Sequence, residues 1–121
     1  MAGKFTEKKS RFHSHLYSLE SPDEVPDILK IHRKTYRKAN HHCYGMLFHG
    51  SSDFKNDGEV GHPGKVLLEL LEKHSLDRHV LVVSRIFGGV KLGVGGVSRA
   101  FRGAGEQTIL VWKNGQTVAN E

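Results

Sequence analysis

The chain has 121 residues, of which 37% are hydrophobic and 26% charged, and its formal net charge is +5. This length fits one domain with a single core, and the composition is that of a globular protein rather than a disordered one. No apolar run approaches the roughly 20 residues needed to cross a bilayer, and the N-terminus lacks the apolar segment of a secretory signal. We therefore expect one cytoplasmic domain over residues 1–121, with its core at about 5–110 and no membrane partner.

Cysteine and charge usage narrow the class of protein further. Cys43 is the only cysteine, which excludes an internal disulfide framework and fits a reducing compartment. Positive charge concentrates in two segments that contain no acidic residue. The first contains Lys30, Arg33, Lys34, Arg37 and Lys38, and the second contains Arg78, Arg85, Lys91, Arg99 and Arg102. Such segments fit an anionic partner such as RNA or an acidic protein face, although many basic faces serve only solubility.

The first half of the chain predicts a strand followed by a helix. Alternation of apolar and polar residues over 9–19 places Phe12 and Leu16 on one face of a half-buried strand. Ser21 begins a capping box with a proline after it, so we expect a helix to start there and to end near Asn40. Its apolar stripe leaves an outer face that is strongly cationic.

The second half predicts two further strands and two helices. We expect a strand over 42–48, with room for short extra strands within 45–60, and a helix from Pro63. The strongest strand is 79–87, whose continuous apolar run fits a central strand covered on both faces or a buried one. A third helix follows over about 96–110.

The last residues, 111–121, contain the turn pair Asn114-Gly115, which predicts a short hairpin or a frayed end. The expected order is therefore β-α-β-(β)-α-β-α. We assign the chain to the α+β class, as a two-layer α/β sandwich with its helices on one face of a sheet.

The glycine-rich segment 88–96 has the most unusual composition. A strand that ends in glycines and leads into a helix exposes backbone N–H groups at the helix N-terminus, where the macrodipole favours an anion. No Gly-Lys-Ser/Thr follows the glycines, and the third position of a dinucleotide fingerprint is Ser98, so neither standard nucleotide-binding loop is present. The simpler interpretation is a tight connection that needs positive φ and close packing.

Two other clusters carry reactive side chains. His41 and Cys43 alternate on one strand, and His13 and His15 could complete a composite site with them, but two ligands are too few for zinc. A nucleophilic Cys43 would need a depressed pKa and an orienting base. We expect no metal and no cofactor.

Two carboxylates, Asp57 and Glu59, flank Gly58 before the second helix. They could form an acid/base pair or hold a hard cation. A turn stabilised by Asp57-Gly58 explains the same residues more simply.

Three segments together resemble the Impact family: 41–44, then Asp57-Gly58-Glu59 with Gly64-Lys65, then the long run 83–101. The family's opening strand, rich in Lys-Lys-Ser-Arg-Phe, is similar to residues 8–12. In order and spacing the resemblance covers about residues 5–110. The loop 56–65 departs from the prokaryotic pattern by being one residue shorter.

The resemblance implies a fold similar to the second domain of small-subunit ribosomal protein five and to domain four of elongation factor G. It also implies a role in translation control. Eukaryotic members interfere with the starvation-responsive initiation-factor kinase by competing for its ribosome-associated activator. We expect this chain to correspond to the shared domain alone, for which the family offers no agreed catalytic residues.

Our leading hypothesis is a non-enzymatic binding module whose basic glycine-loop face contacts RNA or a ribosome-associated protein. The expected binding residues are Arg85, Gly88, Gly89, Lys91, Gly95, Gly96, Arg99, Arg102, His41, Asp57, Glu59 and Lys65. The alternative is a hydrolase-like enzyme that uses Cys43 with a histidine, or Asp57 with Glu59. The oligomeric state stays open, with a monomer as the working expectation.

Overall fold

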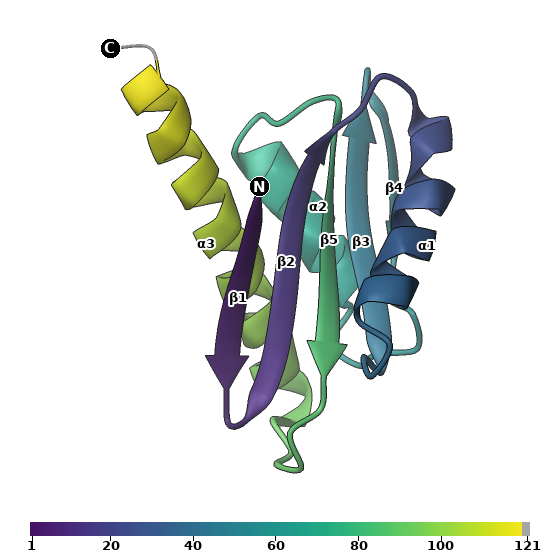
Figure 1. The fold of residues 1–121 in the computed structure, drawn as a ribbon, viewed down its shortest axis with the longest axis vertical. Coiled ribbons are helices and arrows are strands. Elements are labelled where there is room, and N and C mark those ends of the chain that lie inside the picture. The colour runs from purple at the N-terminus through teal and green to yellow at the C-terminus, as the bar shows by residue number, and fades with distance from the viewer. Residues whose placement is uncertain (120–121) are drawn as a thin grey trace.

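The computed structural model describes residues 1–119 and contains one five-stranded antiparallel sheet and three α-helices (Figure 1). The elements in chain order are β1 (Ala2–Glu7), β2 (Ser10–Ser18), a 3-10 turn η1 (Pro22–Glu24), α1 (Val25–Thr35), β3 (His41–Phe48), β4 (Ser51–Lys55), α2 (Pro63–Lys73), β5 (His79–Ile86) and α3 (Gly93–Ala119). The strands lie in the order β1-β2-β5-β3-β4. The α+β class and the alternation of strands and helices are confirmed.

Both faces of the sheet are covered, because β5 is apolar on both sides. Leu81 and Val83 belong to the core under α2 and α3, whereas Val80 and Val82 belong to a second core under α1. Figure 1 shows α1 on the opposite side of the sheet from α2 and α3. The expectation that all helices share one face therefore holds for α2 and α3 and is wrong for α1.

The start of α1 follows its sequence signal, but its end does not. Ser21 and Glu24 form the reciprocal capping box, and η1 leads directly into α1. The helix ends at Thr35 rather than near Asn40, because Tyr36 leaves helical geometry with φ −111° and ψ 63°. Asn40 instead accepts a hydrogen bond from the Phe87 backbone at 3.0 Å.

Both ends of the chain differ from expectation. At the N-terminus, β1 was not predicted, yet it pairs along β2 and packs Phe5 against the core. At the C-terminus, α3 runs to Ala119, so the hairpin expected at Asn114-Gly115 is wrong. Ile109 and Trp112 continue the apolar side of α3 onto the sheet, which favours helix over a turn. Residues 120–121 of the expected tail lie outside the described residues.

A close contact between β3 and α2 fixes the segment that leads to the candidate site. A Cβ on Gly45 would lie 2.2 Å from the backbone nitrogen of Leu68, and one on Gly64 would lie 2.4 Å from the carbonyl oxygen of Lys55. The backbones therefore touch, and the loop between β4 and α2 is held against the sheet. No helix within residues 1–119 has the length and apolar character to cross a membrane.

Candidate functional site

The end of β5, the glycine-rich loop and the first turns of α3 form the surface that we call the glycine-loop face (residues 87–99). Gly89 and Gly93 adopt φ values of +88° and +73°, which other residues rarely do. A Cβ on Gly88 would lie 2.1 Å from the carbonyl carbon of Lys9, in the turn between β1 and β2. These glycines are thus required by the tight connection itself. Gly95 and Gly96 lie within the first turn of α3, which starts at Gly93, three residues earlier than expected.

Behind this face lies a buried ion pair between Arg85 and Glu59. Nη1 of Arg85 donates to Oε2 of Glu59 at 2.7 Å, and the two side chains are only 7% and 6% exposed. Arg85 also donates to the Ser10 hydroxyl at 3.3 Å, and His41 Nε2 lies 3.4 Å from the same glutamate oxygen. Arg85 was expected to be a surface cation, but its charge is already paired. It ties the loop at Glu59 to the centre of the sheet.

Asp57 completes this network from the other side. Its carboxylate accepts the backbone N–H of His42 at 2.7 Å, and its carbonyl accepts from His41 Nδ1 at 2.8 Å. His41, Asp57, Glu59 and Arg85, which the sequence singled out separately, are therefore brought together. Their hydrogen bonds and ion pairs connect the loop at 57–59 to β2, β3 and β5, so the arrangement holds the loop in place. Nε of Arg85 is buried without a hydrogen-bond partner.

One hollow of about 320 Å³ opens between this network and α3. We call it the loop hollow; its lining consists of Glu59, Val60, Arg85, Phe87, Lys91, Leu92, Gly93, Val94 and Val97. Val60, Phe87 and Val94 are exposed, and Val94 presents 61% of its surface to solvent. A polar pair at the base and apolar side chains at the rim make this hollow suited to receive an apolar group.

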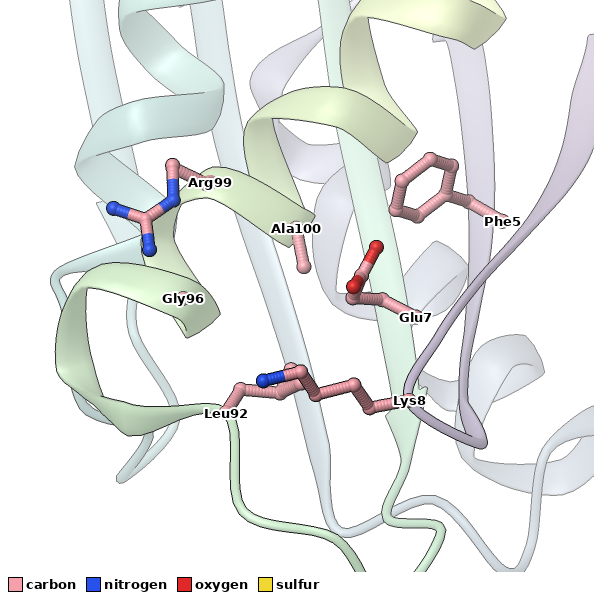
Figure 2. A pocket seen from close by; sticks show the side chains of 7 residues that line it. All are labelled: Phe5, Glu7, Lys8, Leu92, Gly96, Arg99 and Ala100. Carbon is pink, nitrogen blue, oxygen red and sulfur yellow. The ribbon is translucent and has the colours of Figure 1, made fainter.

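A second hollow of about 290 Å³ lies between β1 and α3 (Figure 2). Its lining consists of Phe5, Glu7, Lys8, Leu92, Gly96, Arg99 and Ala100. Figure 2 shows Glu7 and Lys8 extending from the end of β1 toward the first turns of α3. These two residues were missed, because nothing in the sequence predicted β1 or placed its turn beside the glycines.

The remaining expected cations divide into two groups. Lys91 and Arg99 line the hollows, whereas Arg102 and Lys65 line neither of them. All four are exposed, and within residues 1–119 none of them forms an ion pair. Lys91 and Arg99 are therefore the two expected cations that are both free and placed at the face.

Cys43 and the histidines of the enzymatic alternative do not form a reactive site. Cys43 is fully buried, its Sγ donates to the Asn56 carbonyl at 3.1 Å, and burial raises the pKa of its thiol far above the usual range. His13 and His15 face α1, on the opposite side of the sheet from Cys43, so the composite site is wrong. In the described part of the chain, no group of three or more His, Cys, Asp or Glu could hold a metal ion.

The fold defines a small α+β domain with an antiparallel sheet, and the site is a pair of shallow hollows beside a glycine-rich turn. The family model of the Impact N-terminal domain matches residues 8–109, and the chain belongs to this family. The predicted resemblance is confirmed.

Individual relatives agree with this assignment. An IMPACT family member of Thermus thermophilus is 36% identical over 102 residues, which covers 84% of this chain and 56% of that protein. YvyE of Bacillus subtilis is 36% identical over 99 residues, with 78% and 45% covered. The chain therefore spans about half the length of the curated relatives it matches.

Solved structures give the same result. A crystal structure of a hypothetical protein matches with a TM-score of 0.83 and 28% identity, over 89% of this chain and 55% of that one. The two-domain translational regulator Yih1 matches with a TM-score of 0.55 and 25% identity, over 88% and 46% respectively.

Proposed function

We propose that this domain is a cytoplasmic, non-enzymatic binding module in the regulation of translation. The similarity to Yih1, which is described as a translational regulator, supports a role in the regulation of translation. The glycine-loop face is the contact surface in this proposal, and its partner is a ribosome-associated protein or RNA.

Exposed apolar side chains around the loop hollow carry the proposal and favour a protein partner. Val60, Phe87 and Val94 are exposed large apolar residues that line the loop hollow together with Lys91, and the exposed Val90 directly precedes Lys91 in the chain. Apolar patches with a charged rim mark protein interfaces, whereas a nucleic-acid surface is dominated by cations. The N-terminus of α3, together with Lys91 and Arg99, adds positive potential that fits an acidic rim on the partner.

We expect the double variant Lys91→Glu/Arg99→Glu to capture at least tenfold less partner from native extract than the wild-type domain does. Reversing two rim charges replaces attraction by repulsion and chiefly slows association. The measurement is affinity capture by wild-type and variant domains, with and without nuclease treatment, followed by identification of the bound species. The control variant, Lys73→Glu/Arg78→Glu, makes the same change of charge away from the glycine-loop face. These two residues precede the start of β5, whereas the glycine loop follows the end of β5.

Capture that survives nuclease and is lost only in the Lys91/Arg99 variant supports a protein partner at this face. Capture that nuclease abolishes for the wild type assigns the partner to RNA instead. Equal capture by both double variants removes the glycine-loop face from the proposal.

A further inference from the structure

A second surface lies on the other side of the sheet, along α1. Lys30, Arg33, Lys34 and Arg37 line one open hollow of about 690 Å³ with no other residue among its lining. The spacing i, i+3, i+4 and i+7 brings residues to one side of a helix, and here it continues into the turn after Thr35. All four side chains are exposed, so the hollow is walled by cations alone.

Within the described residues this charge is not neutralised by ion pairs, although Arg33 also lines a hollow that contains Asp53. No acid occurs between Asp27 and Asp53, and none of the four cations forms an ion pair within residues 1–119. The negative end of the helix dipole accounts only for cations in the last turn. Lys30 lies before that turn and Arg37 lies beyond the helix, so an external anion explains them better than the dipole does.

Aromatic side chains adjoin the cations at the C-terminal end of α1. A second hollow of about 330 Å³ shares Arg37 with the first; its lining consists of Arg11, Thr35, Tyr36, Arg37, Lys38 and Ile86. The Tyr36 ring stacks on His13 with centroids 4.3 Å apart and planes 14° from parallel, and both residues are partly exposed. A row of cations that leads to a stacked aromatic pair fits a strand of phosphates carrying unpaired bases.

We propose that the exposed side of α1 binds the backbone of single-stranded nucleic acid, with Lys30, Arg33, Lys34 and Arg37 on the phosphates and the Tyr36 end beside a base. The Tyr36 hydroxyl is held by His15 at 2.6 Å, which fixes the partly exposed ring at the end of the row of cations. An acidic peptide would satisfy the cations but would bring no base to pack beside this ring. This surface goes beyond the proposed function, since α1 and α3 lie on opposite faces of the sheet (Figure 1).

The test uses the purified chain and a fluorescein-labelled oligouridylate of about twelve nucleotides, followed by anisotropy at several salt concentrations. Four neutralised phosphates on a single strand predict a slope of log K against log salt of about −3. The variant Arg33→Glu/Arg37→Glu is expected to bind at least tenfold more weakly and with a shallower slope. Because all four side chains are exposed, its thermal unfolding should fall only slightly, through the acid that Arg33→Glu places in the last turn of α1. Lys30→Glu/Lys34→Glu provides a second variant with the same expectation.

Two comparisons separate this proposal from the one above. The variants Lys91→Glu/Arg99→Glu and Lys73→Glu/Arg78→Glu should bind the oligouridylate within about twofold of the wild type. A larger loss in the Lys91/Arg99 variant than in both α1 variants would overturn the proposal and place nucleic acid at the glycine-loop face. An oligoglutamate peptide that competes as well as the oligouridylate would also overturn it, because α1 would then be a general anion surface.

Discussion

Replacement of Glu59 by glutamine is expected to lower the free energy of unfolding by about 3–5 kcal/mol. The change removes one charge of a buried pair and leaves the Arg85 guanidinium, itself only 7% exposed, without its carboxylate. His41 loses the same partner, and the loop at Glu59 loses its attachment to β5. Urea unfolding of wild-type and variant chains measures the effect.

A matched control uses the same chemical change at the surface. Glu20→Gln breaks the ion pair with Arg78, in which the glutamate is 89% exposed, and such pairs are worth about 0–1 kcal/mol. The double variant Glu59→Gln/Arg85→Met removes both buried charges and should recover part of the loss. A cost for Glu59→Gln no greater than that for Glu20→Gln would show that the buried pair does not anchor the loop.

Acidification from about pH 6.5 to about 4.5 is expected to lower the free energy of unfolding by about 2 kcal/mol through His32 alone. His32 is 1% exposed between α1 and the sheet, with Tyr17 and Ser84 on its two ring nitrogens at 2.8 and 3.0 Å. Burial lowers its pKa from 6.5 to about 3. Between these two pKa values His32 is protonated in the unfolded chain and neutral in the folded chain. The free energy of unfolding is therefore highest above pH 6.5 and decreases as the pH falls.

Neighbouring histidines act in the same direction. Burial also lowers the pKa values of His13, His15 and His42, which lie around His32 and Ser84. The variant His32→Gln removes one titrating group, so its mean loss of stability per pH unit over this range should be smaller by about 1.2 kcal/mol. Chemical unfolding at several pH values measures both slopes. Identical slopes would show that His32 does not sense pH.

Elements with a local signal could be predicted from the sequence. The capping box at Ser21 placed the start of the first helical segment, and the apolar run of β5 predicted a strand that is either covered on both faces or buried. What covers the second face could not be predicted, because it depends on how His32 and Leu29 meet residues of β2 and β5. The strand β1 was missed because Phe5 is the only large apolar residue within it and its other partners come from β2.

The site shows the same division between local and long-range information. The glycine loop was identified from composition, and its positive φ values follow from glycine chemistry. Arg85 was assigned to the surface because it belongs to an acid-free stretch that also holds Arg78, Lys91, Arg99 and Arg102. Its actual partners, Ser10 and Glu59, lie far away along the chain. Lys8 likewise lies beside α3 because β1 pairs with β2, which places the turn after β1 next to the glycine loop.

The most direct test of the glycine-loop face places a photo-cross-linking amino acid at Val94 in nuclease-treated native extract. Val94 lies on the rim of the loop hollow, and Phe54, exposed on the edge strand β4, provides the control position. The proposed interface predicts a discrete protein adduct from position 94 and none from position 54. The same adduct from both positions, or none from position 94, would contradict it.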